Sequence, residues 1–233
     1  MIRWRTLHKW LGLLIAVQVF LWTGSGIVIS YLDGAETSGQ VTRRAPASPE
    51  PLALDAARLQ EPASLTAELV AAGITGISDL SLQRLHGTAV YRVSSAQGVS
   101  LFDASSGESL SIDAKLAASL AERSYAGSGR LVDVSHLVAG THDLVRHAGD
   151  LWRVSYDDDL ATRVYLAADD GRLLAHLNDS YDLLHLMLTL HFMDYSGGHN
   201  FNNWLIRVVA MLTLAMVISG IYLLSRVVPK KSR

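Results

Sequence analysis

The chain of 233 residues contains no cysteine. This absence excludes a disulfide framework, cysteine-ligated zinc, an iron–sulfur cluster and a thiol nucleophile. Any metal or cofactor would have to be held by histidine, methionine, carboxylate, tyrosine or backbone groups. Charged residues are also scarce. They make up 18% of the chain, whereas soluble domains carry about 25%. The low charge content indicates segments that lie in a membrane.

Several motifs of common enzymes and binding proteins are missing as well. The chain has no glycine-rich phosphate loop, no HExxH zinc motif and no Ser/His/Asp order that would support a hydrolase. Between residues 34 and 180 it carries 12 basic and 19 acidic residues, a net charge of −7. This region lacks the basic surface of nucleic-acid-binding proteins, so we expect no nucleic-acid partner.

Two long stretches are almost free of charge. Residues 10–32 contain no charged residue, and residues 204–225 contain Arg207 alone. A bilayer core requires about 20 apolar residues, so each stretch is long enough to cross it. The first is also longer than the apolar core of a signal peptide, which has about 7–15 residues. We therefore predict two transmembrane helices, 10–32 and 204–225, surrounded by lipid bilayer.

The charges beside these stretches predict the orientation of the chain. The segments 1–9 and 226–233 are basic, with Arg3, Arg5, Lys9, Arg226, Lys230, Lys231 and Arg233. Basic flanking residues favour the cytoplasmic side of a membrane. Both termini should therefore be cytoplasmic. Residues 34–180 should lie in the periplasm, outside the inner membrane of a bacterium.

The region between the predicted spans contains an internal repeat. Val90-Tyr-Arg-Val-Ser94 resembles Leu151-Trp-Arg-Val-Ser155, and in both copies a second short strand, a glycine turn and a return strand follow. The pattern predicts two β units, at about residues 85–126 and 150–180, with a helix at 114–125 between the strands of the two copies. Tyr91 and Trp152 should occupy comparable positions in two similar sheets.

A short apolar helix is expected before the second span, at residues 181–195. Its apolar stretch, 183–193, would reach about 16 Å, half the thickness of a bilayer core. It contains His185 and His191, which would lie about 120° apart around a helix and cannot face one axial site. Imidazoles in so apolar a segment are costly unless they are hydrogen-bonded or ligated. Satisfied interfacial histidines and ligands are both open interpretations.

These motifs, in this order, resemble those of PepSY-domain membrane proteins (the PepSY-associated transmembrane family). The resemblance rests on Leu7-His-Lys-Trp-Leu-Gly12 at the start of a membrane helix, on the repeated Tyr/Trp-Arg-Val strands, and on the histidine-bearing helix before the last span. It implies an α+β periplasmic PepSY-like domain of two small antiparallel sheet-plus-helix repeats, anchored by two transmembrane helices. Larger relatives have four spans.

The resemblance also implies two functions of different classes. Some membrane members of the family are implicated in siderophore-iron reduction, with b-type haem between their membrane helices. The chain would then be an inner-membrane, haem-binding electron-transfer component, an oxidoreductase or its subunit. It would support extracytoplasmic reduction of ferric iron or a ferric siderophore. Other PepSY proteins bind or restrain peptidases. The alternative is a non-catalytic, membrane-anchored binding or regulatory module for a protease, a transporter or another membrane partner.

The candidate residues for haem b lie at the two membrane faces: His8, Gly12, His185, His191, His199 and Arg207. We expect His8 and at least one of the other histidines to be axial ligands of haem iron, with His191 and His199 brought together by the intervening glycines. Gly12, one turn from His8, would leave room for the macrocycle. Arg207 would pair with a propionate, or remain an interfacial arginine. A bare metal ion with Asp194 as a ligand is the less favoured alternative.

The positions of these histidines predict an assembly. His8 belongs to the cytoplasmic face and the other three to the periplasmic face, about 30 Å away, so they cannot share one haem. The cytoplasmic end of the second span has no histidine. A second ligand for His8 must therefore come from another chain. We expect a homodimer or a partner membrane subunit, with one haem at each face.

Histidines and carboxylates of the middle region have simpler interpretations. His136, His142 and His147, with Asp143, have spacings that place them on different faces of a helix. They are expected to be solvated or capping residues. The acidic run 157–159 is expected to form a hairpin turn.

Overall fold

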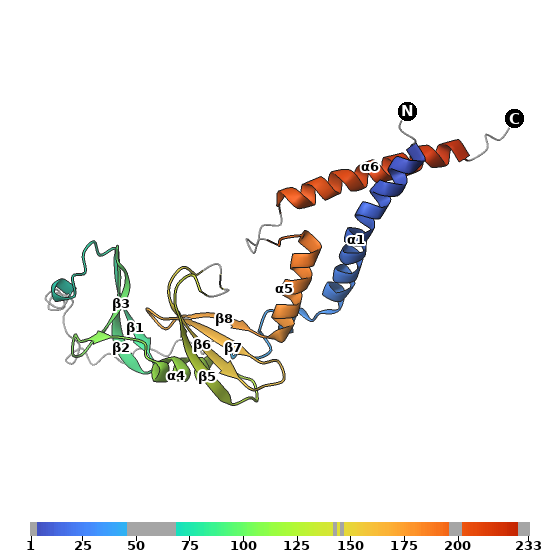
Figure 1. The fold of residues 1–233 in the computed structure, drawn as a ribbon. Coiled ribbons are helices and arrows are strands. Elements are labelled where there is room, and N and C mark those ends of the chain that lie inside the picture. The colour runs from blue at the N-terminus through green and yellow to red at the C-terminus, as the bar shows by residue number, and fades with distance from the viewer. Residues whose placement is uncertain (1–3, 46–68, 142–143, 145–146, 196–201, 228–233) are drawn as a thin grey trace. The chain divides into compact units, whose positions relative to one another are not determined.

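A computed structural model describes residues 4–45, 69–141, 144, 147–195 and 202–227. The chain forms two compact units. The helical unit comprises Met1–Asp33 and Asp182–Arg233, and the sheet unit comprises Gly34–Tyr181. Figure 1 shows the helices and strands of both units.

The helical unit contains α1 (Trp4–Tyr31), most of α5 (Asp179–Phe192) and α6 (Trp204–Val227). Two of these helices, α1 and α6, are long and apolar enough to cross a membrane. Helix α1 covers the predicted span 10–32 except for residue 32 and begins six residues before it, and α6 covers the whole predicted span 204–225. The start of α1 packs beside the last turns of α6, so the two helices are antiparallel (Figure 1).

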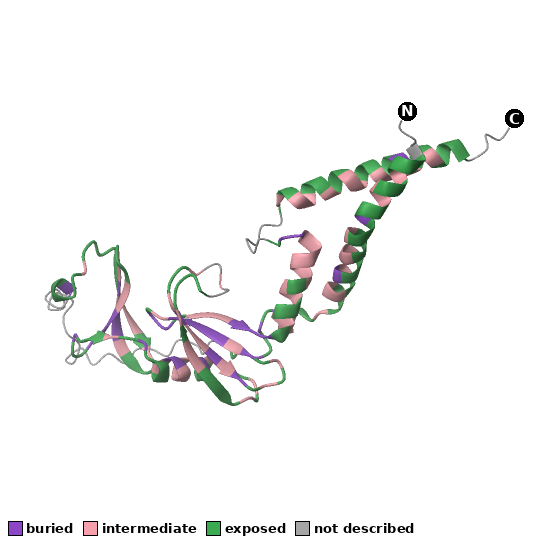
Figure 2. Ribbon diagram, in the orientation of Figure 1, coloured by how far each residue is buried: buried purple, intermediate pink, exposed green. Residues whose placement is uncertain are grey.

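One stripe of α1 faces α6 and α5, and one stripe of α6 faces α1. On α1 the stripe has a spacing of three and four residues, as the helical period requires: His8, Gly12, Ile15, Gln18, Trp22 and Ser25 are buried or half-buried. On α6 the matching residues are Leu205, Val209, Leu212, Met216, Ser219 and Gly220. The remaining faces are largely exposed (Figure 2). Apolar side chains such as Phe20 and Ile221 on these faces suit contact with lipid.

The sheet unit contains two four-stranded antiparallel sheets. The first consists of β1 (Asp79–Leu85), β2 (Thr88–Ser95), β3 (Gly98–Asp103) and β4 (Ser109–Leu110). The second consists of β5 (Leu131–Leu137), β6 (Leu151–Tyr156), β7 (Arg163–Ala167) and β8 (Leu173–Leu177). Strands follow one another in chain order in both. Helix α4 (Ala114–Ser124) separates the sheets in sequence, and α2 (Gly34–Thr37) begins the unit.

The two sheets are copies of one arrangement, as the repeat predicted. Tyr91 pairs with Leu82 and Phe102, and Trp152 pairs with His136 and Leu166. The turn after β3 closes with a bond from Gly107 N to the Asp103 carbonyl, and the turn after β7 closes with the same bond from Gly171 to Ala167. The predicted fold class and the equivalence of Tyr91 and Trp152 are therefore confirmed.

Helix α4 supplies the centre of the main core. Its Ala117 and Ala121 are fully buried and pack in one cluster with Val90 of the first sheet and Val154 of the second. Small residues on α4 let both sheets approach it closely. Asp113 caps the helix by accepting a bond from Leu116 N at 2.7 Å. Many of the buried positions of the sheet unit lie on the strands and on α4, as Figure 2 shows.

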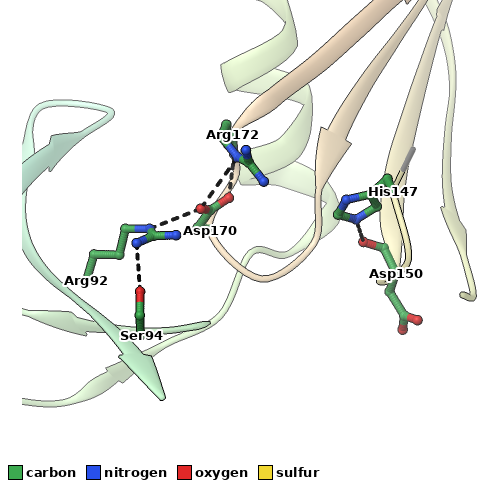
Figure 3. Close-up of polar contacts among 6 residues, drawn as sticks. All are labelled: Arg92, Ser94, His147, Asp150, Asp170 and Arg172. Atoms are coloured by element: carbon green, nitrogen blue, oxygen red, sulfur yellow. Dashed lines mark hydrogen bonds and ion pairs between the residues drawn. The ribbon is translucent and has the colours of Figure 1, made fainter. Parts of the chain in front are cut away.

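An ion pair joins the two repeats. The Arg92 guanidinium donates to the buried Asp170 carboxylate at 3.1 Å, and Arg172 lies 3.9 Å from the same oxygen (Figure 3). Arg92 also donates to the Ser94 hydroxyl at 2.9 Å. Asp170 stands in the β7–β8 turn and Arg92 on β2. The second copy therefore carries the counter-charge for an arginine of the first.

The segment 34–44 is fastened to β8 and α4. Gly39 has a φ of +69° and lies against His176, where a Cβ would approach the His176 Cβ to 2.8 Å. The Thr42 carbonyl accepts a bond from Ala126 N, and Arg44 N donates to the Ser124 carbonyl. Asn178 donates from Nδ2 to the Glu36 carbonyl at 2.8 Å, and Ser180 donates to the Glu36 carboxylate at 3.2 Å. The first and last residues of the sheet unit are thus tied to each other.

Candidate functional site

The first candidate histidine, His8, lies against α6. Its Nδ1 is 2.7 Å from the hydroxyl oxygen of buried Ser219. That hydroxyl donates its own proton to the Met216 carbonyl, at 2.8 Å. With its proton on that carbonyl, the Ser219 oxygen accepts from the imidazole, and in this arrangement His8 carries its proton on Nδ1. This tautomer leaves the Nε2 lone pair of His8 free of a proton.

Small residues make this contact close. A Cβ added to Gly220 would lie 3.2 Å from Cε1 of His8, so a larger residue there would press on the ring. One turn further along α1, a Cβ on Gly12 would lie 3.6 Å from Sδ of Met216. Within one chain, Met216 therefore fills the space over Gly12 that we expected a flat ligand to use. A macrocycle beside Gly12 would have to displace the Met216 side chain.

The second candidate, His191, repeats the arrangement at the other end of α1. Its Nδ1 is 3.1 Å from the hydroxyl oxygen of buried Ser25. Ser25 donates to the Leu21 carbonyl at 2.6 Å, so His191 also donates through Nδ1 and keeps an unprotonated Nε2. A Cβ on Gly26 would lie 3.6 Å from its Cε1. Each histidine thus meets a serine–glycine pair on a facing helix.

The two histidine–serine pairs are far apart. His8 and Ser25 are separated by 17 positions on α1, which corresponds to about 26 Å along a helix. His191, bound to Ser25, and His8 therefore belong to opposite ends of the helical unit. The structure brings each histidine to a serine, and it does not bring the two histidines together.

The other predicted ligands have different surroundings. His185 is half-buried on α5, six residues before His191. Arg207 is exposed and lies off the stripe of α6 that faces α1. His199 and the predicted approach of His199 to His191 lie outside the described residues. Among the residues that the structure describes, no cluster of three or more His, Cys, Asp or Glu side chains could hold a metal ion, and Asp194 is buried at the end of α5.

The histidines of the sheet unit form local contacts. His147 lies with Nε2 3.1 Å from the Asp150 carbonyl (Figure 3), and His136 lies 3.5 Å from the Asp150 carboxylate. His136 also stands edge-on to Trp152, with 4.9 Å between ring centres. His142 and Asp143 lie outside the described residues. These contacts are of the kind expected for structural histidines at a loop.

The acidic run lies in the β6–β7 connection. Asp158 accepts bonds from Thr162 N and from the Tyr125 hydroxyl, at 2.8 and 2.7 Å. Burial would raise the pKa of Asp158, and the bonds from Thr162 and Tyr125 outweigh it and lower the pKa. Burial and the bond to Asp158 raise the pKa of Tyr125 to about 12. Asp158 therefore organises a turn.

A buried imidazole was not singled out from the sequence. His176 on β8 is 3% exposed, with Nε2 3.0 Å from the Ser124 hydroxyl. Burial and then the charge of Arg43 lower its pKa to about 4. The residue is uncharged at neutral pH and packs under the segment 34–44. The sequence of β8 does not alternate, so only the fold shows that His176 is buried and what covers it.

Ser25 and Ser219 were also missed as partners of the histidines. Nothing in the local sequence distinguishes them from other serines of the apolar helices, such as Ser30. Their partners are 166 and 211 residues away, so the pairing depends on how the helices meet.

Comparisons with known proteins add one match. A family model described as the PepSY-associated TM region matches residues 5–233. No curated protein and no solved structure matches the chain. The match covers both apolar helices and both sheets.

Proposed function

The chain belongs to the PepSY-associated TM family and is a membrane protein, and we propose that it is a haem-carrying electron-transfer component. Its place would be the inner membrane of a bacterium, with both termini in the cytoplasm and the sheet unit in the periplasm. It would support reduction of ferric iron or a ferric siderophore outside the cytoplasm.

The observation that carries the proposal is the shared chemistry of His8 and His191. Each donates Nδ1–H to a serine that is itself committed to a helix carbonyl. Histidine ligands of metals usually have their second nitrogen hydrogen-bonded in this way, which fixes the tautomer and the ring orientation. Both Nε2 lone pairs could then hold haem iron. Haem, when bound, would supply a carrier that takes up and releases one electron at a time.

The distance between the two histidine–serine pairs determines how many haems the chain would hold. The two histidines are about 26 Å apart along α1, which is too far for both to bind one haem. Each end would therefore hold a separate haem. Two groups near the two ends of α1 would together form a route for electrons across the bilayer. Ser219 and Ser25 would orient the rings, and the surrounding apolar side chains would keep water out.

The ligand set of His8 favours two copies of the chain. In the described part of α6 no histidine stands near His8, and Met216 fills the space beside Gly12. A second His8, from a second copy, would complete a bis-imidazole site. Two chains with two spans each would also reproduce the four spans of the larger relatives.

The proposal is tested by the absorption spectrum of the full chain, purified in detergent from cells supplied with haem. A Soret band that shifts on addition of dithionite is expected. His8→Ala and His191→Ala should each remove part of the reduced spectrum, whereas His86→Asn, at an exposed hairpin position, should leave it unchanged.

Two outcomes would count against the proposal. If wild-type protein from haem-replete cells carries no haem, the chain is better described as a membrane-anchored PepSY binding or regulatory module. If haem is present but both alanine variants keep the full spectrum, the ligands are other residues. Ferric-chelate reduction by reconstituted protein should be lost together with the haem.

A further inference from the structure

A cavity lies in the helical unit between α1 and α6. Its volume is about 340 Å³, within the range of about 300–1,000 Å³ found for small-molecule sites. Six of its lining residues show how it is built: Leu14 and Gln18 from α1, Met193 and Tyr195 from the segment after α5, and Val209 and Leu212 from α6. Met193 is buried, while Leu14 and Tyr195 are more than half exposed. The cavity therefore has a closed floor and an open rim.

A hydrogen bond links the start of α6 to the end of α5 near the cavity. Asn203 donates from Nδ2 to the Phe192 carbonyl at 2.9 Å and caps α6 by accepting from Ile206 N at 3.0 Å. Met193 adopts a φ of +52°, a conformation that costs a non-glycine residue free energy. Burial of its side chain against the cavity offsets this cost. The packing of Met193 and the bond between Asn203 and Phe192 therefore define one side of the cavity.

Gln18 is the one polar side chain at the wall of this cavity among the residues that the structure describes, apart from the phenol of Tyr195. Its Nε2 is 3.5 Å from the Leu190 carbonyl, at the outer limit of a hydrogen bond. Its Oε1 has no hydrogen-bond partner among the described residues. Gln18 stands near the middle of α1, where an amide oxygen without a partner is costly. An occupant that can bond to this amide would therefore be favoured.

We propose that this cavity binds the ring of a membrane quinone. Such a ligand has an apolar ring and tail for the aliphatic walls. It also has a carbonyl oxygen that can accept from Gln18 Nε2, or, when reduced, a hydroxyl that can donate to Gln18 Oε1. A lipid acyl chain fits the walls equally well but leaves the amide unpaired. The choice of a quinone also rests on the proposed function, which requires an electron donor, and a quinone is a donor that dissolves in the membrane.

Binding is tested by titrating decylubiquinone into the full-length protein in quinone-free detergent, with the heat of binding as the readout. Saturable binding is expected. Gln18→Leu should raise Kd about five- to tenfold, the effect of one neutral hydrogen bond. Val209→Trp, which fills the cavity, should abolish binding.

Matched controls carry the same changes away from the cavity. Thr23→Leu removes an exposed polar group of α1, and Val217→Trp adds a ring to an exposed position of α6. Both should bind like the wild type. Unchanged Kd values in Gln18→Leu and Val209→Trp would overturn the proposal. It would also be overturned if 1-decanol displaced decylubiquinone and bound wild type and Gln18→Leu equally, since that result describes a site for aliphatic chains.

The readout does not depend on haem, so the two proposals can fail separately. Quinone binding by a protein without a haem spectrum would reject the proposed function and keep the site. A haem spectrum without quinone binding would reject the site and keep the function.

Discussion

The hydroxyls of Ser219 and Ser25 lie within hydrogen-bond distance of Nδ1 of His8 and of His191 and so influence which ring nitrogen carries the proton. Ser219 and Ser25 each have one proton to give, and each gives it to a carbonyl of its own helix. The oxygen that remains can only accept. Serine side chains in helices often donate to a carbonyl three or four residues back. Here that bond leaves the serine oxygen as an acceptor for an imidazole on another helix.

The effect of these serines can be measured as a reduction potential. If haem is bound as proposed, Ser219→Ala and Ser25→Ala would remove the acceptor and make the imidazole a weaker donor to the iron. The reduction potential of the haem at that end should then rise by about 20–60 mV, the energy of one hydrogen bond. Potentiometric titration of the reduced spectrum gives the value. Ser30→Ala and Ser225→Ala delete similar helix-bonded hydroxyls on exposed faces and should not change it. A shift of equal size in these controls would contradict the assignment.

His176 predicts a dependence of stability on pH. Its pKa is about 4 in the folded chain and 6.5 as a free group. Because the folded value is lower, the unfolded chain binds a proton first as pH falls. Stability should be full above pH 6.5 and should decrease by up to roughly 3 kcal/mol as pH falls from 6.5 to 4.

The measurement compares the wild type with His176→Gln, which keeps an N–H donor for Ser124 but cannot titrate. Urea unfolding of the sheet unit is monitored in the full chain in detergent through its susceptibility to protease. Between pH 7 and pH 4.5 the wild type should lose more unfolding free energy than the variant. Equal losses in both proteins would show that other groups account for the dependence.

At the scale of elements, the segment 34–44 is fixed by its contact with β8. Gly39 and Gly73 have nearly the same φ, +69° and +70°, but only Gly39 has neighbours within 4 Å, all of them atoms of His176. Gly73→Ala should destabilise by about 1 kcal/mol through backbone strain alone. Gly39→Ala adds a clash with backbone of β8 and should cost at least 2 kcal/mol more.

Urea midpoints of the two glycine variants separate strain from contact. The difference between them measures the contact, since the strain is common to both. Similar midpoints would show that segment 34–44 can lift from β8 without cost.

The elements could be predicted where their period was strong. The apolar spans and the strands around Tyr91 and Trp152 have clear patterns, and both appear as expected. Strands β1 and β5 begin before the predicted units 85–126 and 150–180. Both are edge strands without a buried residue, so their apolar signal is weaker than that of the central strands. The residues of the candidate site also fall into those that the sequence predicted and those that it did not. His191 was evident from its apolar surroundings and His8 from the motif at the start of the first helix, whereas Ser25, Ser219 and the cavity arise from contacts between distant segments.

At the scale of the whole molecule, the absence of cysteine allows a direct test of orientation. Single cysteines at exposed Ser128 and Ser225 report on the sheet unit and on the end of α6. In intact spheroplasts, a membrane-impermeant maleimide should label Ser128→Cys and spare Ser225→Cys until the membrane is broken. The cysteine-free parent is the control for background labelling. The reverse pattern would invert the proposed topology and, with it, the side on which the proposed reduction of ferric iron would take place.

The bonds from Asn178 and Ser180 to Glu36 have a consequence for how such a chain can evolve. They bring the entry and the exit of the sheet unit together, which is the condition under which one domain can be inserted into another. The unit is in this sense a cassette carried between α1 and α5. Recombination could exchange it for another with adjacent ends, and the helices with their histidine–serine pairs would remain intact.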